Sequence, residues 1–567
     1  MEYSEGVLRL SLFFMSVLAN ECYGCWEQER VALLGLKPSI NHPYMALPCH
    51  HGRRTSIAVN EPANYFFIVG LAGFEKLSRL SNLQILDLTD NYFNNSILTS
   101  LNGFSTLKTL FGWFEQLERA EYNRDNIDNI ISNQGLCELR STLQHLDLSY
   151  NKLEGNLPGC LAKLTSLRFL DLYSNQFTGN IAFSPLIQMT FLEHLVLSNN
   201  RFQVPITFPS FFNHSKLKLI ESQENELVSE LNFQTPAPRF QLAVIRLSHS
   251  ASSNTSSTTD FPNFLYYQKD LQIVEISQIS FDGKFPNWLL ENNRGLVGLF
   301  LPNNSFRRYP QLPSHPETQL LALDISHNNF QHIPRNIGTT FPGLIWLTMS
   351  GNRFGGSIPS SLGDMSSLQI LDLSNNQLSG GIPEHLAMET KGFSYALDIF
   401  AETKHRSYQG EFGREAEVKF TNKGTSLSYK GINLDLFSAI DLSCNRLTGH
   451  IPNEIGNIGE IRALNLSHNG LSGTIPTTFS NLYKVESLDI SFNNLSGKLP
   501  SQLNELYSRP YLMYHTITCP TPYHKVKDMF NLINLIIVAT LAIHFFVDHH
   551  FQDLAPPLGH LQQPQQS

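Results

Sequence analysis

The stretch SSLQILDLSNNQLSGGIP, residues 366–383, decides the fold. Leu368, Leu371 and Leu373 give an LxxLxL spacing, and Asn376 follows three residues after the last leucine. Because the last two leucines alternate with polar residues, the pattern predicts a short strand with one buried face. The closing LSGGIP adds a glycine that permits a turn and a proline that fixes an extended or 3₁₀ return path.

The same unit recurs from Leu83 onward with a period of about 24 residues, within the range of leucine-rich repeats. In stacked coils, an asparagine amide at the turn can satisfy buried backbone groups that water does not reach. We therefore predict a leucine-rich-repeat solenoid, a curved right-handed superhelix with a parallel β-sheet on its concave face and 3₁₀ or extended segments on its convex face. The frame places its last position at Asn91, Glu115, Asn151, Asn175, Asn200, Asn225, Ser250, Ile279, Asn304, Asn328, Asn352, Asn376, Asn445, Asn469 and Asn493, of which twelve are asparagine.

Composition and motifs exclude several classes of protein. A chain of 567 residues that is 41% hydrophobic and 16% charged is folded, and its length exceeds one ordinary core. The net charge of -9 and the lack of a long basic run argue against a nucleic-acid partner. No Walker, Rossmann, HExxH or GxSxG motif is present, so we expect no enzyme, no cofactor and no metal.

The amino terminus predicts export. The apolar run Leu10 to Ala19 follows Arg9 and is too short to span a bilayer, which favours a signal peptide at 1–24 over a buried helix. Seven cysteines suit an oxidising compartment. Together with the signal peptide, N-x-S/T sequons predict glycosylation at Asn94, Asn213, Asn254, Asn303, Asn465 and Asn494.

Two cysteine pairs are candidates for disulfides. Cys137 and Cys160 lie at nearly the same phase of successive coils, a separation that a disulfide spans, so a structural bridge is favoured over two buried thiols. Cys49 is a candidate partner for Cys25, which opens the amphipathic helix CWEQERVALLGLK of a predicted amino-terminal cap.

The repeat is interrupted most extensively between Leu386 and Leu436. This segment contains EFGREAEVKFTNKGTSLSYKG at 411–431, where apolar residues alternate with polar ones. The alternation predicts an inserted hairpin rather than a disordered loop.

Several motifs resemble those of plant receptor-like proteins, which carry extracellular leucine-rich repeats and an island insertion. They are CWEQERVALLGLK, GLCEL with LPGCLAKL, the LxGxIP ends, and VKFTNKGTSLSYKG leading into FSAIDLSCNRLTG. The chain departs from the family pattern in its reduced cysteine set in the caps and in having three coils after the island, where four are usual. The resemblance implies a cell-surface receptor without a kinase that binds a peptide, glycan or protein ligand and signals in defence or development through a co-receptor or adaptor kinase.

The carboxy-terminal segment 529–547 is long enough for a single transmembrane span, with an apolar cap helix as the rival interpretation. About twenty residues follow it, too few for a catalytic domain. This topology predicts a plasma-membrane protein with an extracellular amino-terminal part, or alternatively a protein secreted to the apoplast. The expected organisation is a signal peptide 1–24, a cap 25–80, repeats 81–385, an island 386–435, repeats 436–503, an atypical cap and juxtamembrane segment 504–528, the span 529–547 and a tail 548–567.

The concave face is the candidate binding surface. Asp residues recur there as a property of the repeat, so we interpret them as structural and not as an acid/base pair. Exposed aromatic side chains on a rigid surface are typical ligand anchors. The candidate ligand-binding residues are His145, Tyr150, Phe169, Tyr173, His194, Phe300 and Trp346, with Asp372 beside the island and Lys419 and Tyr429 within it.

Two other functions stay open from the sequence. The same solenoid suits a secreted enzyme inhibitor or an adhesion module. The shortened caps also allow a truncated, non-functional receptor paralogue.

Overall fold

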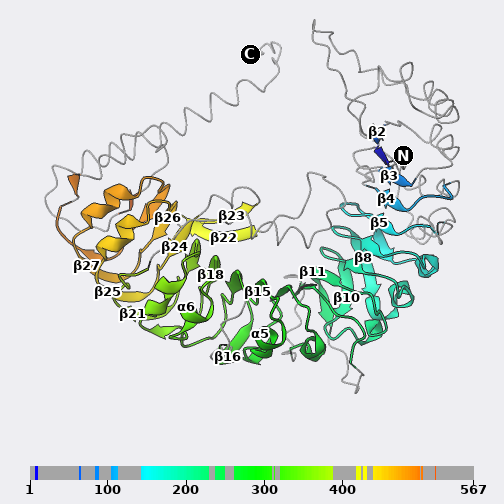
Figure 1. Cartoon of the computed structure of the whole chain (residues 1–567), viewed down its shortest axis with the longest axis horizontal. Coiled ribbons are helices and arrows are strands. Elements are labelled where there is room, and N and C mark those ends of the chain that lie inside the picture. Colours follow the sequence, from blue (N-terminus) through cyan, green and yellow to red (C-terminus); the bar gives the residue numbers. More distant parts are fainter. Residues whose placement is uncertain are drawn as a thin grey trace, which may run out of the picture. The chain divides into compact units, whose positions relative to one another are not determined.

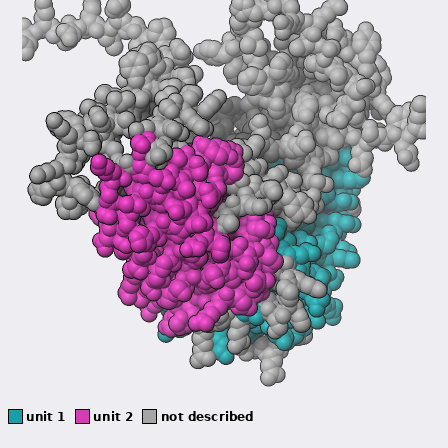
Figure 2. All heavy atoms as spheres, turned by 60° about the vertical axis from the view of Figure 1, so that its left-hand side comes forward, with its two compact units in different colours: residues 1–329 teal, residues 330–567 magenta. Residues whose placement is uncertain are grey.

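The structure is a computed structural model whose strands and coils form two compact units, residues 1–329 and 330–567 (Figures 1 and 2). Each unit is described by itself. The described residues are 7–9, 63–65, 84–87, 104–112, 139, 142–228, 237–249, 261–308, 312, 319–386, 417–422, 425–430, 438–498, 500–501 and 517–518.

In the first unit, one short strand per coil pairs in parallel with the strand of the next coil, forming the main sheet (Figure 1). Its strands, in order of pairing, are β2 (Ala63–Tyr65), β1 (Val7–Arg9), β3 (Ile85–Asp87), β4 (Thr109–Phe111), β5 (His145–Asp147), β7 (Phe169–Asp171), β9 (His194–Val196), β11 (Leu219–Val228), β12 (Val244–His249), β13 (Ile273–Ser277), β15 (Gly298–Phe300) and β17 (Ala322–Asp324).

A second set of strands, together with short helical segments, completes the coils of the first unit. The second strands are β6 (Glu154–Asn156), β8 (Gln176–Asn180), β10 (Arg201–Pro205), β14 (Asp282–Lys284) and β16 (Ser305–Arg308). The 3₁₀ segments are η4 (Gly159–Lys163), η5 (Ile181–Phe183), η6 (Pro185–Gln188), η7 (Pro209–Phe211) and η8 (Asn263–Tyr267), and α5 (Trp288–Asn292) replaces them in one coil.

The second unit repeats this design. Its main sheet contains β18 (Trp346–Thr348), β20 (Ile370–Asp372), β24 (Ala439–Asp441), β26 (Ala463–Asn465), β28 (Ser487–Asp489) and β30 (Ile517–Thr518). Its second strands are β19 (Gly355–Gly356), β21 (Gln377–Gly380), β25 (Arg446–His450), β27 (Gly470–Gly473) and β29 (Asn494–Leu495), and its helical segments are α6 (Ile337–Thr340), η9 (Ser360–Asp364), η10 (Asn453–Asn457) and η11 (Thr477–Asn481).

The predicted solenoid of parallel strands and 3₁₀ segments is confirmed. The second leucines of the LxxLxL frames, such as Leu146, Leu170 and Leu195, are fully buried beneath the main sheet. Phe177 and Phe202 extend this core under β8 and β10, with stacked rings 5.8 Å apart. Side chains that alternate with the leucines lie on the other side, the sheet face, which corresponds to the predicted concave face.

The asparagines of the frame tie each coil to the preceding one. Asn200 accepts a hydrogen bond from the amide of Phe177 (3.0 Å) and donates to the carbonyls of Leu172 (2.8 Å) and Leu197 (3.0 Å). The amides therefore satisfy buried backbone groups, as the sequence predicted. The same pattern of bonds to the preceding coil occurs at Asn175, Asn225, Asn304, Asn328, Asn376, Asn445, Asn469 and Asn493.

In one coil, a histidine takes the place of the frame asparagine as hydrogen-bond acceptor. The frame assigned this position to Ser250, but the imidazole Nδ1 of His249 accepts the hydrogen bond from the amide of Leu227 (3.1 Å). An unprotonated ring nitrogen offers an acceptor like an amide oxygen, so a histidine one residue earlier replaces asparagine.

The insertion leaves the repeat uninterrupted in space. β20 pairs directly with β24, and Asn445 donates to the carbonyl of Leu373 across 72 positions of sequence. In the segment of sequence that connects β20 to β24, β22 (Glu417–Asn422) and β23 (Thr425–Lys430) pair antiparallel, which confirms the expected hairpin. The limits of the island at 386 and 435 stay predictions.

Predictions on the termini fall mainly outside the described residues. Val7–Arg9 forms strand β1, but the apolar run 10–19 lies outside them, as do most of the amino-terminal cap and the segments 504–516 and 519–567. The signal peptide, the cap boundaries, the transmembrane span and the tail therefore stay predictions.

We predict that Asn200→Leu lowers the free energy of unfolding by about 3 kcal/mol, because it leaves buried backbone groups of Phe177 and Leu172 without partners. Urea unfolding of the full chain, followed by circular dichroism, measures this change. Asn199→Gly is the control, since Asn199 is exposed and has a φ of 58° that glycine adopts readily. Equal stability of the two variants would contradict the proposed role of the ladder.

A second prediction concerns the close contact between helical segments of adjacent coils. A Cβ at Gly338 of α6 would lie 1.5 Å from the carbonyl oxygen of Ser361 in η9, so Gly338→Ala forces the coils apart. We expect a loss of about 2 kcal/mol or more in the same unfolding experiment. A Cβ at Gly343 meets nothing within 4 Å, and Gly343→Ala should therefore leave the unfolding midpoint unchanged.

Candidate ligand-binding surface

Three successive strands bring predicted residues together on the sheet face of the first unit. His145 of β5, Phe169 of β7 and His194 of β9 are paired in register. Their ring centroids lie 6.2 Å and 6.0 Å apart, and all three side chains are half-buried. Because cross-strand neighbours on one face lie within contact distance, the rings form one continuous row.

Two tyrosines form a second row beside the first. Tyr150 and Tyr173 follow β5 and β7, and their rings meet edge to face with centroids 5.0 Å apart. Tyr150 has a left-handed backbone with a φ of 56° and remains 41% exposed. A tyrosine that presents this much of its ring on a rigid coil is a suitable anchor for a ligand.

Two carboxylates lie between these rows. Asp147 and Asp171 are paired in register, and each accepts a hydrogen bond of 2.8 Å from a backbone amide two residues later, at Ser149 and Tyr173. These bonds fix the direction of both carboxylates. We name seven side chains, which lie on β5, β7 and β9 or just after β5 and β7, the aromatic–acidic surface: His145, Asp147, Tyr150, Phe169, Asp171, Tyr173 and His194.

The other candidates do not join this surface. Phe300 is half-buried on β15, with β11, β12 and β13 between it and β9. Trp346 and Asp372 belong to the second unit. Lys419 and Tyr429 lie on the paired strands β22 and β23, and their side chains are outside the described part of the structure.

The expectation that Trp346 is exposed is wrong. Its side chain is 6% exposed, and its register partner Ile370 is fully buried. A wide apolar ring beside an apolar cross-strand neighbour buries its surface instead of presenting it to solvent. Asp372 is likewise buried, with 9% exposure.

A charged cluster on the sheet face was missed by the sequence analysis. The Arg246 guanidinium of β12 forms ion pairs with Glu221 of β11 and with Glu275 of β13, the latter at 3.3 Å. Gln223 donates a 2.7 Å hydrogen bond to the same Glu275. Burial raises the pKa of Glu275 despite the opposing effect of Arg246. An arginine in VIRLS, where seven of the fifteen coils carry aspartate, was the available signal.

Two adjacent carboxylates on the sheet face of the second unit also have unusual electrostatics. Asp372 and Asp441 are paired in register on β20 and β24, and Asp441 is 1% exposed. Burial, followed by repulsion from Asp372, raises the pKa of Asp441 from an ordinary 3.8 to about 7. Ser443 and Asn465 donate hydrogen bonds to Asp441 at 2.9 Å and 3.2 Å and partly oppose this rise.

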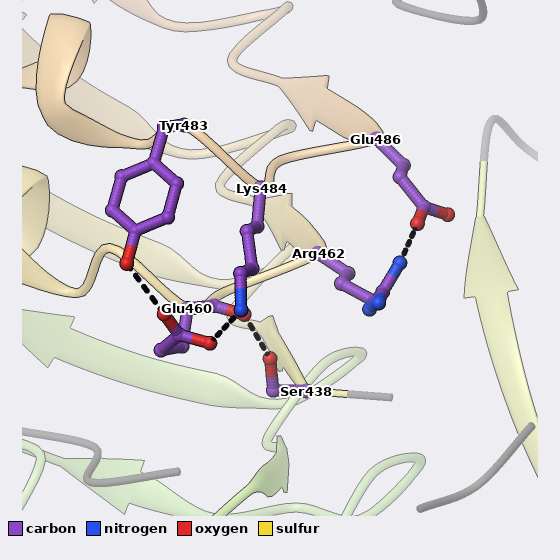
Figure 3. A network of polar contacts seen from close by, with 6 residues as sticks. All are labelled: Ser438, Glu460, Arg462, Tyr483, Lys484 and Glu486. Carbon is purple, nitrogen blue, oxygen red and sulfur yellow. Dashed lines mark hydrogen bonds and ion pairs between the residues drawn. The ribbon is translucent and has the colours of Figure 1, made fainter. Parts of the chain in front are cut away.

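A polar network lines one edge of β24, β26 and β28 (Figure 3). Glu460 accepts hydrogen bonds from Tyr483 and Lys484, and Arg462 pairs with Glu486. Ser438 donates to the backbone carbonyl of Glu460 at 2.7 Å. Since the paired side chains are partly exposed to solvent, these ion pairs contribute little to stability.

Predicted modifications are only partly located. Cys160 in η4 is disulfide-bonded, and its partner lies outside the described residues, so the bond to Cys137 stays a prediction. The pair Cys25 and Cys49 lies outside them as well. Among the predicted glycosylation sites, Asn213, Asn303 and Asn494 are exposed, and Asn465 is half-buried. Asn94 and Asn254 lie outside the described residues.

A metal site and a membrane-spanning helix are both absent from the described residues. Within them, no group of three or more His, Cys, Asp or Glu residues has the arrangement of a metal site. In that same part of the chain, no helix combines the length and the apolar character needed to cross a bilayer. The segment 529–547 lies outside the described residues.

Family models match several parts of the chain. A leucine-rich-repeat model matches residues 318–378, a two-copy repeat model matches 141–186, and a single-repeat model matches 438–458, 460–482 and 484–506.

Similar proteins are plant receptors. The chain is 38% identical to Cuscuta receptor 1 of Solanum lycopersicum over 221 residues, 39% of this chain and 19% of that protein. It is 38% identical to receptor-like protein 15 of Arabidopsis thaliana over 357 residues, 52% of this chain and 35% of that protein. The chain therefore spans about a third or less of the length of these relatives.

Among solved structures, the fold matches the leucine-rich-repeat ectodomain of the Arabidopsis receptor kinase HAESA, crystallised with an amino-terminally extended IDA peptide hormone ligand. The TM-score is 0.52 at 25% identity, covering 80% of this chain and 69% of that one. The structure of a TDR receptor gives a TM-score of 0.51 at 21% identity, covering 79% and 61%.

We predict that the raised pKa of Asp441 makes stability depend on pH. The folded state binds a proton that the unfolded state releases between its ordinary pKa of 3.8 and about 7, so the free energy of unfolding should fall as pH rises through that window. The slope reaches about 1.4 kcal/mol per pH unit for one proton. Asp441→Asn should flatten it and raise stability at pH 8.

The control separates this pair from a general loss of charge. Asp372→Asn removes the repulsion on Asp441 and should also reduce the slope. Asp489→Asn removes one carboxylate of β28 and leaves the pair intact. Urea unfolding of the full chain from pH 4 to pH 8 measures all three variants, and an unchanged slope in both Asp441→Asn and Asp372→Asn would refute the assignment.

Proposed function

Because the chain is a leucine-rich-repeat protein related to the plant receptor-like proteins, we propose that it is a cell-surface receptor for an extracellular peptide. The peptide binds the aromatic–acidic surface of the first unit. Support for a peptide ligand comes from the HAESA ectodomain, whose structure contains a peptide hormone. A glycan or a protein ligand is the remaining alternative.

One observation carries the proposal. Five aromatic or imidazole rings lie in two adjacent rows on β5, β7 and β9 and the residues that follow them, with centroid separations of 5.0 to 6.2 Å within the rows. The parallel ladder holds these rings in place before a ligand arrives. Little side-chain entropy is therefore lost on binding, which is a feature of strong anchors.

The remaining candidates have secondary roles or none. We propose that Phe300 adds a contact to the ligand on the first unit, and that Lys419 and Tyr429 of the hairpin contact a ligand at the second unit. Trp346 and Asp372 are excluded because a side chain with less than a tenth of its surface exposed offers a ligand little to touch.

We further propose that the receptor resides in the plasma membrane with its repeats outside the cell. The segment 529–547 provides the anchor, and a partner kinase carries the signal in defence or development.

Tagged full-length protein in plant cells should remain in the membrane fraction after carbonate washing. Complete release into the wall space would refute the anchor and leave a secreted binding protein.

A binding experiment tests the ligand surface. The low-mass fraction of plant extracellular fluid should raise the melting temperature of the purified full chain, because a ligand that binds the folded state stabilises it. Protease treatment of the fraction should abolish the shift. The variant Tyr150→Ala/Phe169→Ala/Tyr173→Ala should show no shift.

The matched control replaces exposed rings elsewhere on the first unit. Phe183 and Tyr267 are 86% and 51% exposed and lie on η5 and η8, so Phe183→Ala/Tyr267→Ala should keep the response. A shift that survives protease indicates a glycan or another small molecule. A shift that survives in the triple variant places the ligand on another surface.

A further inference from the structure

One row of the sheet face in the first unit is strongly acidic. It consists of the residues that occupy the last position of the three-residue strands and the equivalent positions of longer strands, and all are joined by the ladder register. In the part of the row from β5 to β17, only one cation occurs, and Val196 and Phe300 are neutral. The charged members are Asp147, Asp171, Glu221, Arg246, Glu275 and Asp324.

The chain itself shows how this row accommodates a cation. Arg246 reaches Glu221 on one neighbouring strand and Glu275 on the other, and its side chain is 13% exposed. The carboxylates on the two strands that flank β12 therefore hold the guanidinium of Arg246 between them. Charge-assisted pairs of this kind are among the stronger polar contacts in proteins.

At β5 and β7 the row has two carboxylates on directly adjacent strands, and aromatic side chains surround them. Asp147 and Asp171 are register partners whose directions are fixed by the amides of Ser149 and Tyr173. Phe169 lies on one side of Asp171 along its own strand, and Tyr173 lies on the other. Aromatic faces attract cations, so rings and carboxylates favour the same kind of group.

We propose that the aromatic–acidic surface binds an arginine or lysine side chain of an extended peptide, held between Asp147 and Asp171 and against the rings of Phe169 and Tyr173. This inference rests on the proposed function and adds the chemistry of the ligand. The charge complementarity selects the occupant, because the carboxylates repel an acidic peptide and a neutral glycan gains nothing from their charge.

The test compares two synthetic probes of similar shape and different charge. Hexa-arginine and hexa-citrulline are titrated by calorimetry against the full chain. Hexa-arginine should bind and hexa-citrulline should bind at least tenfold more weakly. The variant Asp147→Asn/Asp171→Asn should weaken hexa-arginine binding by tenfold or more, while its amide oxygens still accept the bonds that position them.

A charge-matched control excludes non-specific attraction. Glu154 and Glu291 are exposed on β6 and α5, outside the sheet face, so Glu154→Gln/Glu291→Gln removes the same net charge elsewhere. It should leave the affinity within twofold of the parent. Equal losses in both double variants, or equal binding of the two probes, overturns the inference.

The outcome separates this inference from the proposed function. If the aromatic triple variant loses the melting shift with extracellular fluid and the Asp147→Asn/Asp171→Asn variant retains it, the receptor proposal stands and the basic ligand is wrong. If cellohexaose competes with hexa-arginine equally in parent and double variant, the rings recognise a glycan and the basic-peptide assignment also fails.

Discussion

The hydrogen bonds of the frame asparagines are the constraint on which the rest of the molecule depends. Each coil turns away from the main sheet at a point where backbone groups are buried, and the amide of one side chain pairs them across two coils. Asn200 illustrates the arrangement, with contacts to Leu172, Phe177 and Leu197. In such a stack, each interface between neighbouring coils adds to the free energy of unfolding of the whole array.

This constraint explains why the scaffold was readable from sequence and the surface was not. The buried leucines and asparagines must satisfy packing and hydrogen bonding at every turn, and these needs repeat with the coil. Leu146 and Asn151 were therefore placed correctly from their spacing alone. The rings of His145, Phe169 and His194 were also assigned to one face, because the strand period determines which residues share it.

Sequence reasoning failed where a property depends on neighbours from other coils. Whether Trp346 is exposed depends on Ile370 beside it, and no rule about aromatic residues contains that information. The partners of Arg246 lie 25 and 29 positions away, so their pairing was visible only after the register was known. The elevated pKa of Asp441 likewise needs both its burial and the nearby Asp372.

The left-handed residue before each frame asparagine has a separate consequence. Tyr150, Ser174, Asn199, Cys444 and Phe492 all occupy this conformation, with φ between 51° and 58°. The backbone there is set by the amide bonds that follow it, whatever side chain it carries, and a residue other than glycine costs about 1–2 kcal/mol. A substitution at this position therefore changes the side chain presented beside the sheet, at a small cost in stability and without altering the path of the backbone. A receptor built on such coils can acquire new recognition residues while its architecture stays the same.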